Sequence, residues 1–246
     1  MNKDLIIGIH SIKAALENPN RASLELFTTK EKKSEFGQIK ENVKINLHST
    51  HQVQELAKGF ARELEHEIQR VPGQSFLLAD TLPELEASEL YELINSQSLK
   101  RLLALDQVSD VHNAGAIVRT ASFYGVDAII LPNQKSFGMP PAFFRNASGG
   151  IEDLKIVRSS SLSKTLNRLK GKGCTLVGLS EHADTELGSL KSSDAPLCLI
   201  LGKEETGISN AVMRTLDYQM ALRPQGLIRS LNVSVAAAVA MEQLFG

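Results

Sequence analysis

The second part of the chain, residues 99–246, predicts an α/β fold with a mostly parallel sheet. Two observations lead to this fold class. Apolar runs of strand length recur along these residues, and stretches with helical periodicity separate them. The strand-length runs are LLALDQV, DAIILP, LKIVR, TLVGLS, LCLILG and YQMALRP, and the helical stretches include NAGAIVRTASFYG, LSKTLNRLKGKG and ISNAVMRTL. Regular alternation of this kind is typical of a parallel sheet with helices on both faces.

The first part of the chain has a different organisation. Residues 1–79 predict a small α/β domain, with helical and strand segments in the order GIHSIKAALENPN, LELFTT, VQELAKGFARELE and SFLLA. Residues 80–98 then contain five acidic residues and no Lys or Arg. This segment predicts an acidic linker or a surface helix that bridges two domains, which places the second domain at 99–246.

The composition is that of an ordinary globular protein. The chain has 246 residues, 42% apolar and 22% charged residues, and a formal net charge of -1. It lacks a signal-peptide pattern and any 18-residue apolar stretch, so we expect a cytoplasmic protein. The net charge is -4 over residues 1–97 and +3 over residues 98–246. That asymmetry permits a polyanionic partner without requiring one.

The two cysteines predict no redox or metal chemistry. Cys174 and Cys198 each lie in an apolar run, and neither has a CxxC or His partner at the spacing of metal ligands. We therefore expect two reduced thiols in the core and no metal site.

A first candidate for function follows the run LLALDQV, because ligands of parallel sheets bind at the carboxyl ends of the strands. In DQVSDVHNAGAIVRTA, residues 106–121, apolar residues at i, i+3, i+4 and i+7 from Ala114 predict a helix with a core-facing stripe. Arg119 lies off that stripe. The plainer interpretation is that Asn113 caps the helix and Arg119 is a solvated charge, and for this segment alone it is the better one.

A second candidate is LCLILGKEETGIS, residues 197–209, where a strand enters a glycine-containing loop. The spacing of Gly202 and Gly207 imitates a phosphate-binding loop, but Ile208 stands where that motif requires Lys. No GxGxxG follows any strand, so a dinucleotide site is not supported. Of the adjacent acids Glu204 and Glu205, both could be solvated or one could point inward.

A third candidate is LRPQGLIRSLNVSVAAAVAMEQLF, residues 222–245. Its second half predicts a helix that is buried nearly all round, and it is far shorter than the ~20 residues of a membrane span. Polar side chains precede this helix. Ser230 or Asn232 as the N-cap would stabilise it by ~1 kcal/mol, but one cap accounts for only one of them.

Together the three segments resemble, in order and spacing, the motifs of the SpoU-type (TrmH-like, SPOUT superfamily) RNA ribose 2′-O-methyltransferases. DVHNAGAIVRTA resembles motif one, LILGKEETGIS motif two and LRPQGLIRSLNVSVAAAVAM motif three. The N-terminal GIHSIKAALE is similar to the start of a small RNA-binding domain, related to ribosomal-protein folds, such as the large-subunit rRNA guanosine 2′-O-methyltransferases carry. The resemblance thus extends over most of the chain.

The resemblance implies a cytoplasmic homodimer that uses S-adenosylmethionine (SAM) and has a trefoil knot in its C-terminal part. It assigns SAM to main-chain groups of the motif-two and motif-three loops, at Gly202, Leu222 and Leu231. It also implies a catalytic neighbourhood made of Arg119, Asn113, Glu204, Ser230 and Asn232. Arginine stays protonated in proteins, so we expect Arg119 to orient a phosphate and to stabilise the developing alkoxide. In a dimer of this family, Arg119 of one subunit completes the site of the other.

Three departures from the family pattern concern loops. Motif two normally has Gly-Ser-Glu followed by Gly, and here the residues are Gly202-Lys203-Glu204-Glu205. Motif three usually has Ile-Pro where this chain has Leu222-Arg223, and the segment near His66 lacks the glycine of the family's N-terminal domain. The first two departures alter the SAM loops, and the third puts RNA docking by the first domain in doubt.

Two classes of function therefore remain at the level of sequence. The first is an active ribose methyltransferase acting on rRNA, with tRNA as the less favoured substrate. The second is an RNA-binding relic that keeps the fold without turnover. Retention of all five candidate catalytic residues favours the enzyme, because a relic has no physical need for them.

Overall fold

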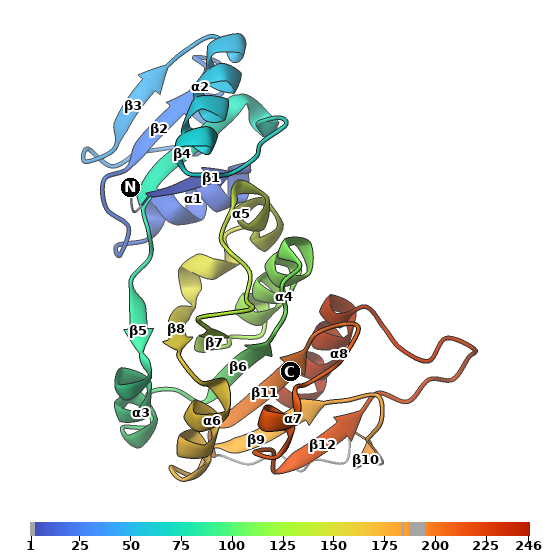
Figure 1. Cartoon of the computed structure of the whole chain (residues 1–246). Coiled ribbons are helices and arrows are strands. Elements are labelled where there is room, and N and C mark those ends of the chain that lie inside the picture. Colours follow the sequence, from blue (N-terminus) through green and yellow to red (C-terminus); the bar gives the residue numbers. More distant parts are fainter. Residues whose placement is uncertain (1–2, 184, 187–194) are drawn as a thin grey trace. The chain divides into compact units, whose positions relative to one another are not determined.

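The computed structural model describes residues 3–183, 185–186 and 195–246 (Figure 1). The chain divides into two units. The first consists of Met1–Pro83 and Gly138–Glu152, and the second of Glu84–Phe137 and Asp153–Gly246. The first unit is therefore built from two separate stretches, and one of them comes from within the expected 99–246 domain.

The first unit contains a four-stranded sheet in the order β1-β4-β2-β3. Strand β4 (Ser75–Asp80) is antiparallel to β1 (Lys3–Ile7) and to β2 (Glu25–Thr28), whereas β3 (Lys44–Leu47) is parallel to β2. The helices are α1 (Ile9–Glu17), α2 (Thr50–Glu63) and α5 (Pro141–Ala147), with 3-10 turns η1 (Lys33–Phe36), η2 (Pro72–Gln74) and η3 (Gly150–Asp153), whose last residue falls in the second unit. Apolar side chains of α2 pack on the stacked rings of Phe27 and Phe76.

A buried ionic network joins the two stretches of the first unit. Arg21 is 4% exposed and donates hydrogen bonds to Asp4, to the Asp80 carbonyl oxygen at 2.7 Å and to Glu152 Oε1 at 2.7 Å. Asn18 Nδ2 donates to Glu152 Oε2 at 2.7 Å. Burial by itself would lower the pKa of Arg21, but the hydrogen bond and charge of Glu152, helped by Asp4, raise it. Through Glu152, the segment 138–152 is thus linked by charge to residues of the first stretch, and α5 adds packing against β1.

Within the described residues, the second unit has an eight-stranded sheet in the order β10-β12-β9-β11-β6-β7-β8-β5, and all neighbouring pairs are parallel. The predicted α/β fold with a mostly parallel sheet is confirmed, and the six predicted runs are six of these strands. The strands are β5 (Glu84–Glu86), β6 (Arg101–Asp106), β7 (Ala128–Pro132), β8 (Lys155–Ser159), β9 (Thr175–Leu179), β10 (Thr185–Glu186), β11 (Leu197–Gly202) and β12 (Tyr218–Ala221).

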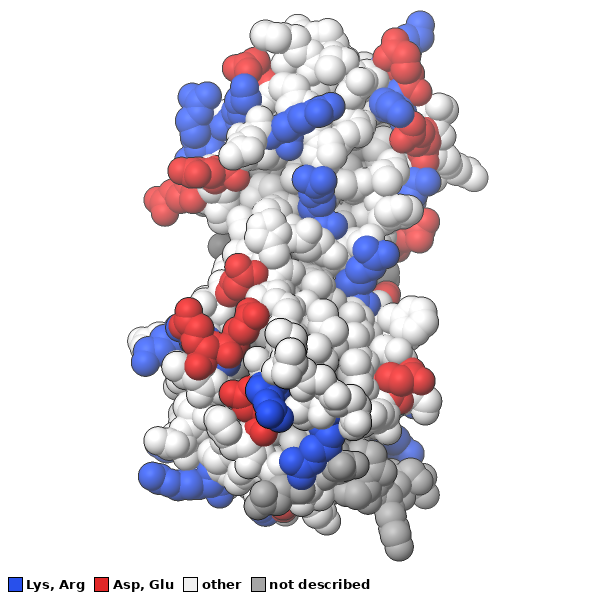
Figure 2. All heavy atoms as spheres, turned by 90° about the vertical axis from the view of Figure 1, so that its right-hand side faces the viewer, with Lys and Arg blue, Asp and Glu red and all other residues white. Residues whose placement is uncertain are grey.

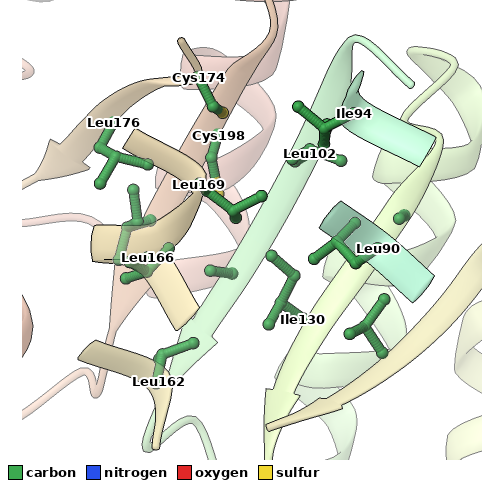
Figure 3. Close-up of a cluster of buried hydrophobic side chains, with 14 of the residues drawn as sticks. Leu90, Ile94, Leu102, Ile130, Leu162, Leu166, Leu169, Cys174, Leu176 and Cys198 are labelled. Carbon is green, nitrogen blue, oxygen red and sulfur yellow. The ribbon is translucent and has the colours of Figure 1, made fainter. Parts of the chain in front are cut away.

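Helices cover both faces of this sheet (Figure 1). One face carries α4 (Val111–Phe123) and α8 (Val233–Phe245), which pack on each other. The other face carries α3 (Ala87–Asn95), α6 (Leu162–Lys170) and the short α7 (Asn210–Met213). Figure 3 shows the core on that second face, formed by residues that include Leu90, Ile94, Leu102, Ile130, Leu166, Leu169, Leu176 and Cys198.

Residues 84–95, expected as part of a linker or a bridging helix, lie within the second unit instead. Strand β5 pairs with β8 at the edge of the sheet, and α3 buries Leu90, Tyr91 and Ile94 in the core. The physical reason is that these three side chains form an apolar stripe at helical spacing, which stabilises the protein when the sheet covers it. The acidic residues occupy the remaining, solvated side.

The apolar sequence of α8 predicts a helix that is buried nearly all round, but the structure shows one exposed side. It buries Val233, Ala237, Ala240, Met241 and Phe245, a stripe that contacts α4 and β11. On its other side Val235 is 49% and Val239 37% exposed, and Phe123 at the end of α4 is 81% exposed. The neighbours within one chain cover only one side of the helix, so an apolar face stays in solvent.

Both cysteines are buried and free, as expected. Burial raises the pKa of Cys174 to about 12 and raises that of Cys198 well above its ordinary value. No helix among the described residues is long and apolar enough to cross a membrane.

Candidate functional site

The three candidate segments leave the sheet at its carboxyl edge. Strands β6 and β11 are parallel neighbours, and their last residues, Asp106 and Gly202, are partners in the register. Strand β12 runs in the same direction and leads into residues 222–232. Because all strands are parallel, the segments that follow these three strands share one edge of the sheet.

The first segment begins with a capped helix. Helix α4 starts at Val111, and its N-cap is Asp110, whose Oδ1 accepts a hydrogen bond from the Asn113 N–H at 2.7 Å. The plainer interpretation of Asn113 as the cap is therefore wrong, since the cap lies three residues earlier. The Asn113 side chain is left for another role, and its Nδ2 donates to Glu204 Oε2 at 3.1 Å.

The second segment forms a tight loop that directs Glu204. Lys203 and Gly207 exchange two backbone hydrogen bonds of 3.1 and 2.7 Å, which close the loop at its base. A Cβ on Gly202 would lie 2.2 Å from the carbonyl carbon of Gly207, so this close return of the chain requires glycine at 202.

The two acids of this loop have different partners. Glu204 contacts the amides of Asn113 and Asn232, whereas Glu205 pairs with Lys203 at 2.6 Å. The hydrogen bond and the charge of Lys203 hold the pKa of Glu205 below its usual value. Of the two possibilities left open by the sequence, the structure favours two solvated acids, since both are exposed, but Glu204 contacts residues of the other two segments and Glu205 pairs within its own loop.

The third segment ends in a residue with two roles. Asn232 is the N-cap of α8, and its Oδ1 accepts hydrogen bonds from the Ser234 N–H at 2.9 Å and from Ser234 Oγ at 2.6 Å. Its Nδ2 donates to Asn113 Oδ1 at 3.0 Å and to the Glu204 carboxylate at 3.3 and 3.4 Å. One side chain thus caps the helix with its oxygen and reaches the other two segments with its nitrogen.

We call Asn113, Glu204 and Asn232 the amide–carboxylate cluster. Each member hydrogen-bonds to both others, so each amide has one orientation that satisfies its partners. The cluster holds together residues separated by 91 and 119 positions in the sequence. It therefore presents a carboxylate and two amides as a fixed polar group at the carboxyl edge of the sheet.

Two of the five predicted catalytic residues lie outside this cluster. Arg119 is exposed on α4, about 120° around the helix axis and about 9 Å along it from Asn113. Ser230 is exposed in the segment before α8. Neither side chain has a hydrogen bond or ion pair with any residue that the structure describes.

The residues predicted to bind SAM lie in the same loops. Gly202 is buried at the end of β11, Leu222 is half-buried after β12, and Leu231 is 48% exposed beside Asn232. Between them, the backbone of residues 224–231 makes no hydrogen bond to the described part of the chain. Its N–H and C=O groups are therefore available to a ligand, which suits a cofactor held by main-chain groups.

Three residues that support the site were not identified from the sequence. Asp110 caps α4, Ser234 pairs with Asn232, and Asp106 accepts a hydrogen bond from the Ser209 N–H at 2.7 Å. Asp110 had a sequence signal, because Asp is a preferred N-cap ahead of an apolar helical stretch. Asp106 had none, since only the parallel register brings it next to the motif-two loop.

Charges on the face drawn in Figure 2 are mixed. Among the described residues there, Lys and Arg are interspersed with Asp and Glu and separated by uncharged areas. Neither sign forms a continuous band on that face. Any RNA contact through it would rest on individual cations rather than on a broad positive surface.

A parallel α/β sheet that gathers three loop segments at its carboxyl edge has the architecture in which α/β proteins bind ligands. The model of the SpoU rRNA Methylase family matches residues 100–242, which contain the first two segments and all but the last three residues of the third. The chain belongs to this family, and the resemblance seen in its sequence motifs is confirmed.

Similar proteins extend over the whole chain. A Staphylococcus aureus (strain MSSA476) protein named as a TrmH family tRNA/rRNA methyltransferase is 27% identical over 249 residues, covering 100% of this chain and 96% of the relative. The SpoU methyltransferase AviRb from Streptomyces viridochromogenes, solved with AdoMet, has a TM-score of 0.76 at 18% identity, covering 98% of this chain and 89% of that one. An AdoMet-bound rRNA methyltransferase from Sinorhizobium meliloti has a TM-score of 0.74 at 16% identity, with coverages of 98% and 86%. These structures share the fold.

Proposed function

We propose that this protein transfers a methyl group from SAM to a ribose 2′-hydroxyl of RNA, with rRNA as the favoured substrate. The amide–carboxylate cluster carries the proposal, because it draws one residue from each of the three motifs into one hydrogen-bonded group in a member of the SpoU rRNA Methylase family. A solved neighbour described as an RNA 2′-O ribose methyltransferase, with a TM-score of 0.70, supports the choice of the ribose oxygen.

We place SAM against the loops at the carboxyl edge. When bound, it supplies an electrophilic methyl group on a positively charged sulfur. Gly202, Leu222 and Leu231 would hold it through their main chains, and the open backbone of residues 224–231 is the observation that favours this. The AdoMet complexes of two structural neighbours point to the same cofactor.

The reaction forms a bond between the 2′-oxygen and the methyl carbon, breaks the bond between that carbon and sulfur, and releases the hydroxyl proton. A ribose hydroxyl is a poor nucleophile until that proton is being removed. We assign Arg119 to the adjacent phosphate and to the developing alkoxide, because a guanidinium is planar and forms paired hydrogen bonds with such oxygens. The cluster and Ser230 would hold the loops and the nucleotide in place, and the base that accepts the proton is left open.

A homodimer would explain why Arg119 lies apart from the cluster. Phe123 on α4 and Val235 and Val239 on α8 are exposed apolar side chains of two helices that pack on each other, and we call them the exposed apolar face of α4 and α8. Arg119 is one helical turn before Phe123. We propose that a second copy covers this face and that Arg119 of each subunit enters the site of the other.

Three further features belong to the same proposal. We place a trefoil knot in the C-terminal part, where the chain after β12 returns to pack α8 against β11 and α4. We assign RNA binding to the first unit, whose mixed sheet with flanking helices suits a small accessory domain. A cytoplasmic location stays a prediction from the sequence.

The decisive experiment mixes the purified protein with labelled SAM and undermodified rRNA or tRNA, followed by digestion to nucleosides. We expect a 2′-O-methylnucleoside from rRNA. Methylated nucleoside only from tRNA would change the substrate, and a methylated base would overturn the ribose assignment. An absence of SAM binding by calorimetry at millimolar ligand would favour the RNA-binding relic instead.

A further inference from the structure

A buried carboxylate without a role in the proposed chemistry contacts the end of the motif-two loop. Asp106 is the last residue of β6 and is 4% exposed. Its Oδ2 accepts a hydrogen bond from the Ser209 N–H at 2.7 Å, across 103 residues of sequence. Placing a carboxylate in such a position costs free energy of desolvation, so the hydrogen bond that it accepts must offset that cost.

The contact between Asp106 and Ser209 forms where the strands β6 and β11 end next to each other. Asp106 and Gly202 are register partners, so β6 and β11 end side by side. The chain leaves β11 at Gly202, forms the loop that contains Glu204, and passes the end of β6 again at Ser209. Asp106 therefore holds the end of the loop, while the backbone pair of Lys203 and Gly207 closes its base.

The segment that follows Asp106 also contacts the loop at Glu204. Seven residues after Asp106, Asn113 donates a hydrogen bond to Glu204 from the start of α4. The segment 106–113 thus contacts the loop at two points, one near its end and one at its acid. If the contact between Asp106 and Ser209 is lost, we expect the loop to shift. Glu204 would then leave the position in which it accepts hydrogen bonds from the side chains of Asn113 and Asn232.

We propose that Asp106 is a positioning residue, which acts through the motif-two loop to keep Glu204 against Asn113 and Asn232. The inference rests on the proposed function for its kinetic consequence. Its structural part, the restraint of residues 203–209, holds for this chain whether or not the protein turns over.

The test compares Asp106→Ala, which removes the acceptor, with Asp106→Asn, which keeps an oxygen acceptor. A matched control is Asp127→Ala. Asp127 accepts hydrogen bonds from the N–H groups of Lys100 and Arg101 at 2.7 and 2.8 Å, at the opposite end of β6. The control loses the same type of contact on the same strand, away from the carboxyl edge.

Amide hydrogen exchange in the full-length protein measures the restraint directly. We expect Asp106→Ala to speed exchange of the hydrogen-bonded amides of Lys203, Gly207 and Ser209 by about tenfold or more, and Asp106→Asn and Asp127→Ala to leave these amides near the wild-type rate. Unchanged exchange in Asp106→Ala would overturn the proposal, and so would an increase there that Asp127→Ala reproduces.

Kinetics test whether Asp106 acts through Glu204. We expect Asp106→Ala to lower kcat about 10- to 100-fold, with Asp106→Asn recovering most of it. In a Glu204→Ala background the Asp106→Ala change should have almost no further effect on kcat, because its target is absent. Full additivity of the two changes contradicts the proposal. If the wild-type protein shows no transfer to any RNA, the proposed function fails while the exchange experiment still decides the role of Asp106.

Discussion

Asn232 shows how one side chain serves both the fold and the site. Its oxygen caps α8 through Ser234, and its nitrogen binds Asn113 and Glu204. The choice between a cap and a site, which the sequence leaves open for this residue, does not have to be made. Because the two functions use different atoms of the amide, substitution can separate them.

Asn232→Ser and Asn232→Ala should differ in their free energy of unfolding but lose the same share of methyl-transfer activity. Serine is an effective N-cap and alanine is not, so we expect only the alanine variant to lose about 1 kcal/mol of unfolding free energy. Both lack the amide nitrogen, so both should lose methyl transfer to the same extent. Urea unfolding and a methylation assay measure the two effects. A serine variant with wild-type activity would show that the nitrogen contacts are dispensable.

The cysteines give a second prediction for single residues. Burial raises the pKa of Cys174 to about 12, so at pH 8 only about one thiol in ten thousand is ionised, against roughly a quarter for an ordinary cysteine. We expect neither thiol to react with a disulfide reagent in the native protein at pH 8, and both to react in guanidinium. Rapid reaction of one equivalent in the native state would contradict the burial of these side chains.

At the scale of elements, the first unit depends on a segment from far along the sequence. Residues 138–152 add α5, which packs on β1, and end at Glu152, which pairs with the buried Arg21. The guanidinium has no solvent to replace these partners. Removing one partner of such a pair leaves a buried charge partly uncompensated, and this lowers the free energy of unfolding strongly. Replacing both partners by apolar residues of similar volume costs much less.

Glu152→Ala should therefore destabilise the protein by about 3 kcal/mol, whereas Glu25→Ala, which removes an exposed ion pair with Lys44, should cost less than about 1 kcal/mol. Glu152→Gln keeps hydrogen-bond acceptors and should fall between the two. The chain has no tryptophan, so circular dichroism is the suitable probe of urea unfolding. Equal losses in the Glu152 and Glu25 variants would show that the network contributes no more than a surface pair.

The elements of the second unit were largely predictable, because buried parallel strands produce unmistakable apolar runs. Other elements were not. Residues 80–98 were expected as an acidic linker or a bridging surface helix, so neither strand β5 nor the packing of α3 in the core of the second unit was predicted. Helix α5 could not be assigned to the first unit, because nothing in PAFFRNA records that its partner is β1.

The same limit applies to the site. The three motifs named Asn113, Glu204 and Asn232, and the folded chain brings these three together. They also named Arg119 and Ser230, which remain apart from the cluster and exposed. The spacing of motifs predicts which segments meet, but hydrogen bonds between particular atoms depend on register, caps and loop closure.

At the scale of the whole molecule, the exposed apolar face on α4 and α8 is a surface that a single chain leaves uncovered. Phe123 is 81% exposed and lies on α4, which also carries Asn113 and Arg119, and Val235 is 49% exposed and lies on α8, which Asn232 caps. If a second copy covers this face, the site is completed across the interface. A clean monomer in light scattering would remove this argument.

Mixed dimers test the shared site. We expect Arg119→Ala and Asn232→Ala to be inactive alone, with Arg119→Ala still binding SAM. When the two are unfolded, mixed in equal amounts and refolded, half of the dimers contain one subunit of each kind. Each of these has one intact site if Arg119 serves the other subunit, so about a quarter of wild-type activity should return. No recovery, despite mixed dimers in mass spectrometry, would place Arg119 in the site of its own chain.

The sequence by itself determined the α/β class of residues 99–246, six strands of the sheet, the family, and the three segments that form the site. These follow from local patterns, because apolar periodicity and motif order are properties of neighbouring residues. Tertiary structure alone decided that Asp106 meets Ser209, that residues 138–152 join the first unit, and that one side of α8 remains exposed. Each of these depends on contacts between residues distant in sequence, which strand register and helix packing create and which no local pattern encodes.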